Sequence, residues 1–189
     1  LLDAIMTNGQ SEILLAGRHG RCCRFDENDA RALGRTASGV RGINIDDDDE
    51  VIGMIAYDPT AEDAQAHSLL VVSENGYGKR SDFDEYRKTN RGGKGVKTLN
   101  ITEKTGELVA MKNVTDENDL MIINRSGITI RMAVSDIKVA GRATQGVRLI
   151  NIREGDSIAA ISAVNKSEED TPEQPVEQSA EQDSQQNNE

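Results

Sequence analysis

The heptapeptide GVKTLNI at residues 95–101 occurs in two related forms elsewhere in the chain, GVRGINI at residues 39–45 and GVRLINI at residues 146–152. Each copy lies at a constant distance after a glycine that closes an apolar run. These glycines are Gly20, Gly76 and Gly127, and a copy begins 19 residues after each of them (20 to 39, 76 to 95, 127 to 146). Three identical spacings are not expected by chance, so the sequence predicts three homologous units.

Each unit contains four short apolar runs separated by turn residues. A repeated asparagine in the third run (Asn44, Asn100 or Asn151) is followed by a polar gap and then by a last run, VIGMI, LVAMK or IAAIS. Runs of about four to six residues that are rich in Ile and Val and bounded by Gly, Asn and Asp are typical of strands. We therefore predict an all-β fold of propeller-like blades, each made of four antiparallel strands. The repeated glycines Gly39, Gly95 and Gly146 are expected to have positive φ or a close backbone neighbour.

The predicted blades cover residues 12–59, 67–115 and 119–164. The opening LLDAIM, within residues 1–11, matches the last run of a unit, so we expect it to be the final strand of a preceding, truncated blade. Residues 167–189 hold eight carboxylates and no Lys or Arg, with many Gln, Ser and Asn residues. Such a segment cannot bury enough apolar surface to fold, and we predict a disordered acidic tail there.

The charge of the chain is unevenly distributed. The formal net charge is −11, with 33 acidic and 22 basic residues, but removing the eight carboxylates of residues 167–189 leaves 25 acids against 22 bases. The body is therefore near neutral. Aromatic residues make up only 3% of the chain, which predicts small aliphatic core layers. The adjacent Cys22 and Cys23 fit a reducing compartment, and neither a signal peptide nor an apolar run of about 18–20 residues is found.

Basic residues recur at matching points of the three units. Solvated strand ends often carry Lys and Arg for solubility, but that use needs no common register. Recurrence in register favours a basic stripe that follows the phosphates of a bent duplex. The predicted DNA-binding residues are Arg21, Arg24, Arg35, Arg41, Lys79, Arg80, Arg87, Arg91, Gly92, Gly93, Lys94, Lys97, Arg131, Arg142 and Arg148.

No group of residues indicates catalysis or metal binding. The three tyrosines stand in loop or turn contexts without an adjacent basic helix. His19 and the Cys22–Cys23 pair lack a second cluster that would complete four zinc ligands. Residues 46–50, DDDDE, lack the alternating ligands and the glycine of a calcium loop. We therefore predict no catalytic residue and no metal site in this chain.

With its repeats and the segment RGGKG at residues 91–95, the chain resembles the C-terminal domain of the A subunit of bacterial DNA gyrase. The box of that family reads Q-R-R-G-G-K/R-G, and TNRGGKG at residues 89–95 matches five of its seven positions, lacking the leading Gln and the first Arg. The phrases ENGYGKR, GRATQGV and TASGVRGI resemble later blades of the domain. The resemblance covers all 189 residues and implies a β-pinwheel, in which neighbouring blades exchange strands.

The resemblance also implies a function. The chain is expected to be the DNA-binding and DNA-wrapping part of a type IIA topoisomerase, which presents a bent duplex for ATP-dependent negative supercoiling. The implied partners are double-stranded DNA, the remainder of the gyrase A subunit, plus the gyrase B subunit in an A2B2 holoenzyme. ATP and Mg²⁺ are expected on other domains, with no cofactor in this chain, and the location is expected to be the nucleoid-associated bacterial cytoplasm.

Several alternatives stay open at this stage. The regular spacing favours gyrase over the related subunit of topoisomerase IV. A propeller used only for protein interaction would bind its partner without sensitivity to salt. Because the principal box of the family is expected upstream, the extent to which this chain wraps DNA alone is undecided. The acidic tail would either serve solubility or act as a DNA mimic that competes for the basic stripe.

Overall fold

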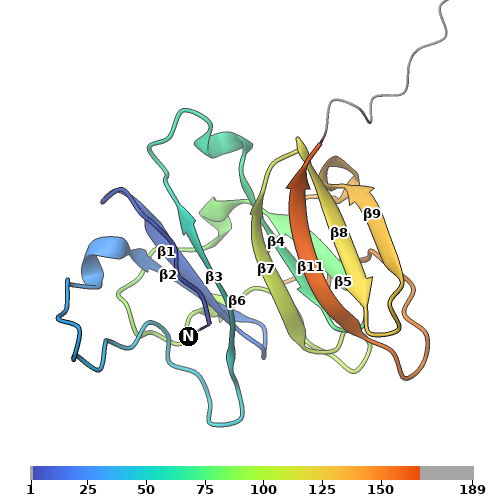
Figure 1. Cartoon of the computed structure of the whole chain (residues 1–189), viewed down its shortest axis with the longest axis horizontal. Coiled ribbons are helices and arrows are strands. Elements are labelled where there is room, and N and C mark those ends of the chain that lie inside the picture. Colours follow the sequence, from blue (N-terminus) through green and yellow to red (C-terminus); the bar gives the residue numbers. More distant parts are fainter. Residues whose placement is uncertain (1, 167–189) are drawn as a thin grey trace, which may run out of the picture.

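The computed structural model describes residues 2–166, which form an all-β fold of short antiparallel strands and single-turn 3₁₀ helices (Figure 1). The strands assemble into three sheets that follow one another along the chain. The all-β class is therefore confirmed. The tail predicted over residues 167–189 lies outside the described residues. Within the described part of the chain, no helix has the length and apolar character needed to cross a membrane.

The first sheet has the order β3-β1-β2-β6. Its strands are β1 (Glu12–Gly17), β2 (Arg21–Asp26), β3 (Val51–Tyr57) and β6 (Val96–Lys97). The first three belong to the first unit, whereas β6 comes from the GVKTLNI copy of the second unit. The third strand of a unit therefore completes the sheet of the preceding unit.

The second sheet repeats this arrangement, with the order β10-β5-β4-β7. Its strands are β4 (Ser68–Ser73), β5 (Tyr77–Ser81), β7 (Leu108–Val114) and β10 (Val147–Arg148). Again the edge strand β10 comes from the following unit. The structure therefore contains the exchange of strands between blades that the resemblance implies.

The third sheet has three strands in the order β11-β8-β9. They are β8 (Asn118–Asn124), β9 (Thr129–Ala133) and β11 (Ile158–Asn165). Within residues 2–166, no strand pairs with the outer edge of β9. Four 3₁₀ turns complete the described elements: η1 (Glu27–Asp29), η2 (Ala64–Ala66), η3 (Phe83–Glu85) and η4 (Val134–Asp136).

Two predicted strands are absent, and both predictions were wrong for the same physical reason. Residues 39–45 form no strand, although the equivalent β6 and β10 do. Residues 2–8 form no strand either, and Leu2 and Met6 are 83% and 94% exposed. A strand is stabilised by the hydrogen bonds and side-chain contacts of its neighbours. In the described structure no neighbouring sheet edge pairs with either segment.

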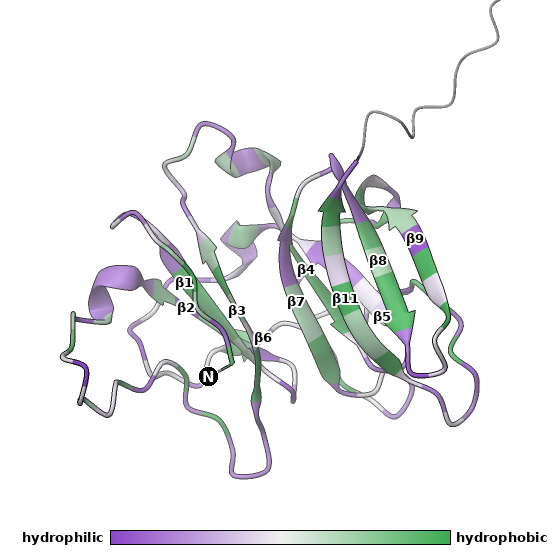
Figure 2. Cartoon of the chain, in the orientation of Figure 1, coloured by the Kyte–Doolittle hydropathy of each residue, from purple (hydrophilic) through white to green (hydrophobic). Residues whose placement is uncertain are grey.

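The core consists of apolar layers between successive sheets, and the layer between the first two also contains Tyr57, Phe83 and Tyr86, although aliphatic layers were predicted. Strand β4 is buried on both faces because its side chains alternate between two layers. Leu69 and Val71 belong to the layer shared with the first sheet, and Leu70 and Val72 to the layer shared with the third. Figure 2 shows apolar residues along these strands and polar residues in the loops that join them. The second blade therefore packs between its two neighbours.

The repeated glycine of the third strand has both of the properties predicted for it. Gly95 has φ +69°, and a Cβ atom at this position would lie 2.4 Å from the carbonyl oxygen of Cys22 in β2. The missing side chain thus allows β6 to approach β2. Gly155 offers a comparison, because it has φ +80° and would meet nothing within 4 Å.

We therefore expect Gly95→Ala to destabilise the chain by about 2–5 kcal/mol, since it combines left-handed backbone strain with a collision against backbone atoms. Gly155→Ala carries the strain alone and is expected to cost about 1 kcal/mol. Urea unfolding followed by circular dichroism at one fixed protein concentration measures both. Equal losses of unfolding free energy in the two variants would show that the close approach of β6 to β2 contributes nothing to the stability of the chain.

Candidate nucleic-acid interface

The exchanged strands lie at the edges of their sheets opposite to β3 and β7. Strands β3, β7 and β11 contact one another in succession, so they line one side of the array of blades (Figure 1). In the first two sheets, β6 and β10 are at the far edge from this side. The third-strand segments therefore place their side chains along the opposite side of the array.

Each third-strand segment carries one exposed cation at the same position, and each cation makes the same contact. Arg41 Nη1 donates to the side-chain oxygen of Asn44 over 3.3 Å, and Lys97 Nζ donates to that of Asn100 over 3.4 Å. Arg148 Nη1 donates to that of Asn151 over 3.0 Å. The repeated asparagine of the sequence is thus an acceptor for the cation three residues before it. Because the amide is neutral, it orients the cation and leaves its charge available.

Further polar groups flank two of these cations. Arg21 lies opposite Lys97 in the register of β2 and β6. In the next sheet Tyr77 takes the place of Arg21, opposite Arg148. The guanidinium of Arg148 lies 5.3 Å from the centre of the Tyr77 ring and donates from Nη2 to the hydroxyl over 2.7 Å. This hydrogen bond lowers the pKa of Tyr77.

The sequence did not single out Lys104, whose ammonium lies 5.4 Å from the centre of the same ring. It stands in the turn after the third strand, where the units differ in sequence. No repeated position marked it.

The glycines of RGGKG have a structural use. Gly92 N–H donates to Gly42 O over 2.7 Å, and Asn44 N–H donates to Gly93 O over 2.9 Å. The side chain of Arg91 donates to the carbonyl oxygens of Asp29 (3.1 Å) and Arg41. This loop therefore fastens the second unit to the third-strand segment of the first. The N–H of Gly92 is engaged within the protein, which is not what a phosphate cradle requires.

A hollow beside this loop has a basic lining. It has a volume of about 320 Å³ and includes Arg87 and the exposed Lys94, together with Thr89, Asn90 and residues 22–24 of β2. Among residues 89–95, Lys94 is thus the side chain best placed to meet an anion from solvent. The hollow continues the line of cations that begins with Arg21 and Lys97.

Three of the predicted DNA-binding cations are buried, and this part of the prediction requires correction. Arg24, Lys79 and Arg80 are 8%, 1% and 7% exposed. Each reaches from the second strand of one unit into the following unit. Their polar atoms are engaged there with protein groups, so they hold adjacent blades together and cannot reach a duplex.

The contacts of these buried cations are specific. Arg24 pairs with Glu12 and donates to the carbonyl oxygens at both ends of η3, Phe83 (2.5 Å) and Tyr86 (3.0 Å). Arg80 repeats this contact one blade later, donating from Nε to Ile137 O over 2.8 Å. Buried charges need such partners, because an uncompensated one is strongly destabilising.

The remaining predicted residues divide by exposure. Arg91 and Arg142 are half-buried, and Arg142 Nη1 donates to Lys97 O over 3.0 Å, as Arg91 does to Arg41 O. Arg35 is the equivalent residue in the first unit and is exposed. Arg131, on β9, pairs with Asp119 at 2.7 Å. The candidate interface therefore consists of the exposed cations of the third-strand side, which are Arg21, Arg35, Arg41, Arg87, Lys94, Lys97 and Arg148.

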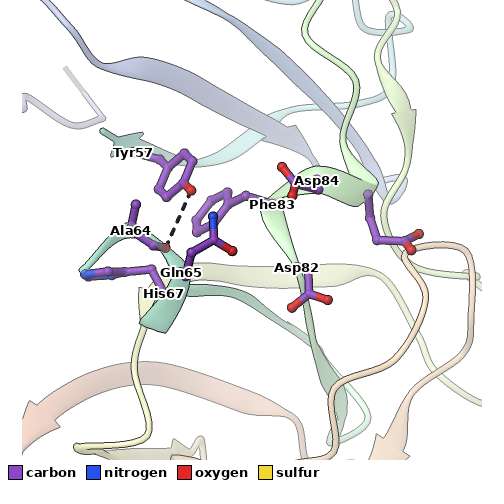
Figure 3. A pocket seen from close by; sticks show the side chains of 8 residues that line it. Tyr57, Ala64, Gln65, His67, Asp82, Phe83 and Asp84 are labelled. Atoms are coloured by element: carbon purple, nitrogen blue, oxygen red, sulfur yellow. Dashed lines mark hydrogen bonds between the residues drawn. The ribbon is translucent and has the colours of Figure 1, made fainter. Parts of the chain in front are cut away.

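A second hollow has the opposite charge. Figure 3 shows this pocket of about 290 Å³, lined by Tyr57, His67 and by Asp82, Asp84 and Glu85 around η3. Tyr57 stacks on Phe83 with the ring centres 3.9 Å apart and donates to Ala64 O. The carboxylates would repel a phosphate. Among residues 2–166, no group of three or more His, Cys, Asp or Glu side chains is placed to hold a metal ion.

The fold and this site together define a class: a repeat-built β-propeller array with exchanged strands and cations in register along one side. Comparison with known proteins agrees. A family model described as the DNA gyrase C-terminal domain, beta-propeller, matches residues 11–58, 67–115 and 118–165. The chain therefore belongs to the family of DNA gyrase C-terminal domains.

The relatives in sequence are gyrase subunits. The A subunit of DNA gyrase from Staphylococcus epidermidis is 44% identical over 169 residues, which cover 89% of this chain and 18% of the relative. The A subunit of DNA gyrase from Staphylococcus aureus is 44% identical over 170 residues, covering 90% of this chain and 19% of the relative. The chain thus spans less than a fifth of the length of these relatives.

Solved structures share the fold. The C-terminal domain of a DNA topoisomerase IV superposes with a TM-score of 0.78 at 21% identity, over 86% of this chain and 49% of that one. A DNA gyrase A C-terminal domain superposes with a TM-score of 0.72 at 21% identity, over 82% of this chain and 50% of that one. At these identities the likeness concerns the fold alone, whereas the sequence relatives distinguish gyrase from topoisomerase IV.

The structural role of Lys79 has a consequence for pH dependence. Burial lowers the pKa of Lys79 from its usual 10.5 to about 8, and its ammonium donates to the carbonyl oxygens of Gly141 (2.6 Å) and Arg142. Between pH 8 and 10.5 the unfolded chain keeps a proton that the folded chain has lost, so stability rises with pH there.

We therefore expect the wild-type chain to gain about 2–3 kcal/mol relative to Lys79→Met as the pH rises from 8 to 10.5. Below about pH 7, where Lys79 is protonated in both the folded and the unfolded state, the difference in unfolding free energy between the two proteins is expected to be constant. Urea unfolding of both proteins across this range measures it. A difference that stays flat up to pH 10.5 would mean that the ammonium is solvated, as it would be if it were free to meet a phosphate.

Proposed function

We propose that this chain binds double-stranded DNA along the third-strand side and bends it, as part of the A subunit of a DNA gyrase. The observation that carries the proposal is the repeated contact of Arg41, Lys97 and Arg148, each exposed and each oriented by a neutral asparagine at the same offset. Three cations in equivalent positions on successive blades suit a polyanion with a regular charge spacing.

The chemistry of these groups defines what they recognise. Cations on the side of a sheet array neutralise phosphates and carry no direct information about base sequence. A duplex that follows the array from blade to blade must bend, so sequences that deform at low energy are favoured. Carboxylates gather elsewhere, as around η3, which keeps this side of the near-neutral body positive.

The rest of the function rests on the relatives. They support a place in a type IIA topoisomerase that introduces negative supercoils, with this chain presenting the bent duplex. The catalytic residues, ATP and Mg²⁺ then belong to the rest of the A subunit, or to the partner B subunit, in an A2B2 holoenzyme. The bacterial cytoplasm, close to the nucleoid, is the corresponding location.

The first test removes the cations in register. We expect Arg41→Gln, Lys97→Gln and Arg148→Gln together to weaken binding to a long duplex and to reduce the slope of log K against log salt by up to about 0.9 for each phosphate that is no longer neutralised. Lys112→Gln is the matched control, since Lys112 is on β7, at the opposite edge of the second sheet. Anisotropy titrations between 50 and 200 mM salt, roughly the range over which phosphate neutralisation is most visible, give both quantities.

Two results would contradict the proposal. One is binding that does not depend on salt, as expected for a module that only contacts proteins. The other is equal loss of affinity in the triple variant and in Lys112→Gln.

The second test concerns the asparagines. Asn100→Asp places a carboxylate beside Lys97 and is expected to weaken DNA binding about as much as Lys97→Gln, because the cation becomes neutralised in place. Asn100→Ala removes only the orienting hydrogen bond and is expected to have a smaller effect. If the Asp and Ala variants bind equally well in the same anisotropy titration, the asparagine has no electrostatic part in DNA binding.

A further inference from the structure

A third hollow, of about 270 Å³, lies where the second and third units meet. Its walls are the turn between β4 and β5 and the two turns that follow the third strands of these units. The three cations that line it are exposed, so the hollow is accessible from solvent. Its ionisable side chains are Tyr77, Lys104, Arg148, Arg153, Glu154 and Asp156.

The hydroxyl of Tyr77 lies among groups that can only donate hydrogen bonds. Arg148 donates to it from Nε over 3.2 Å and from Nη2 over 2.7 Å. The ammonium of Lys104, on the same ring, is likewise a donor without acceptor capacity. Among the hydrogen bonds of residues 2–166, none has this hydroxyl as its donor. Because Tyr77 is only 5% exposed, its proton needs an acceptor that enters through the hollow.

The charges around the hollow determine which acceptor fits. Asp156 is already engaged, since it accepts from Asn124 Nδ2 over 2.6 Å and from Ser126 Oγ over 2.8 Å. Glu154 is left as the opposing charge against three cations. An oxyanion with several oxygens can accept from a hydroxyl, a guanidinium and an ammonium at the same time. A phosphate group therefore suits the hollow better than a neutral acceptor does.

The backbone around the hollow holds these donors in place. Asn75 Nδ2 donates to Glu103 O over 3.1 Å, which fixes the turn that carries Lys104. Leu149 N–H donates to Gly76 O over 2.8 Å and holds the end of β10 against the turn before β5. Donors that are positioned before a ligand arrives lose less conformational entropy when it binds.

The hollow combines two residues that the repeat does not contain. Counting from the repeated glycines, the equivalents of Tyr77 are Arg21 and Ile128, and those of Lys104 are Asp48 and Gly155. The combination is therefore particular to the junction of the second and third units, and no recurrence in the sequence could have marked it.

We propose that this hollow binds one phosphate group, with the Tyr77 hydroxyl donating to a phosphate oxygen while the three cations offset its charge. The inference rests on the proposed function for the source of that group, a phosphodiester of the bound duplex, because β10 lies on the third-strand side. The contact differs from those of the other cations on this side, since it depends on a proton that Tyr77 can lose.

The titration of the tyrosines gives a direct test. Burial raises the pKa of Tyr57 and of Tyr86, whereas the hydrogen bond from Arg148 lowers that of Tyr77, so Tyr77 is the first tyrosine of the chain to lose its proton. A bound phosphate group accepts from the neutral hydroxyl and opposes tyrosinate, and we expect it to raise the pKa of Tyr77 by about 1 or more. By linkage, the chain with deprotonated Tyr77 binds phosphate at least about tenfold more weakly.

The experiment follows the isotope-labelled Cζ of the tyrosines by NMR across the alkaline range. The whole chain is measured alone, with inorganic phosphate and with a long duplex, at one ionic strength set by chloride. Tyr77→Phe assigns the signal and is expected to bind inorganic phosphate about tenfold more weakly, as the loss of a hydrogen bond to a charged group implies. Backbone amide signals of the lining turns report that affinity.

Tyr57→Phe is the matched control, because it removes a hydroxyl that lines the acidic hollow instead. Its affinity for phosphate should equal that of the wild type. The proposal is overturned if neither ligand raises the pKa of Tyr77, or if the two variants lose phosphate affinity equally.

The two ligands separate this inference from the proposed function. A duplex that binds in anisotropy titrations while neither ligand raises the pKa of Tyr77 rejects the phosphate site and leaves the proposed function standing. An increase with inorganic phosphate alone supports the site but rejects the duplex backbone as the source of its ligand. An increase with both ligands supports the site and its place in DNA binding.

Discussion

The hydrogen bonding of one unit's third strand to the preceding unit's second strand is the interaction on which the rest of the structure depends. It carries only two residue pairs at each exchange, Val96 and Lys97 on β2 or Val147 and Arg148 on β5. Yet it brings the repeated glycine against the neighbouring backbone and places Lys97 and Arg148 at the sheet edge opposite to β3 and β7. It also seats the loop that carries Arg91 or Arg142 against the unit before. Blade packing and the basic side are thus two outcomes of a single exchange.

The same exchange divides the cations into two populations with different physical tasks. Three cations of the second strands lie under the following blade, where Arg24 and Arg80 donate to the residue after its 3₁₀ turn and Lys79 donates to its loop. Those on the third strands remain in solvent. A duplex would therefore meet a surface whose supporting charges are already neutralised or hydrogen-bonded inside. Arg41, Lys97 and Arg148, whose partners are neutral amide or hydroxyl groups, remain available to bind the anion.

Much of the fold was predictable from the sequence, because the relevant signals are local. Apolar runs, turn glycines and a fixed spacing located nearly every strand, and β3, β7 and β11 form where VIGMI, LVAMK and IAAIS stand. The two wrong predictions, at residues 39–45 and 2–8, arise because a strand needs a neighbouring strand to pair with. No local sequence pattern shows whether such a neighbour is present. The site divides in the same way. Recurrence identified Arg41, Lys97 and Arg148, but Arg24 and Arg80 recur equally well, and only the packing of the next unit distinguishes a buried cation from an exposed one.

The burial of β4 on both faces has a consequence for how this array comes apart. Leu69 and Val71 face one layer while Leu70 and Val72 face the other, so the middle sheet cannot open without exposing both layers at once. Either outer sheet can detach at the cost of one layer. Among the three described sheets, the free energy of local opening is therefore highest for the middle one. Fluctuations that weaken the contacts with a bound polyanion would, among these three blades, reach the second blade last.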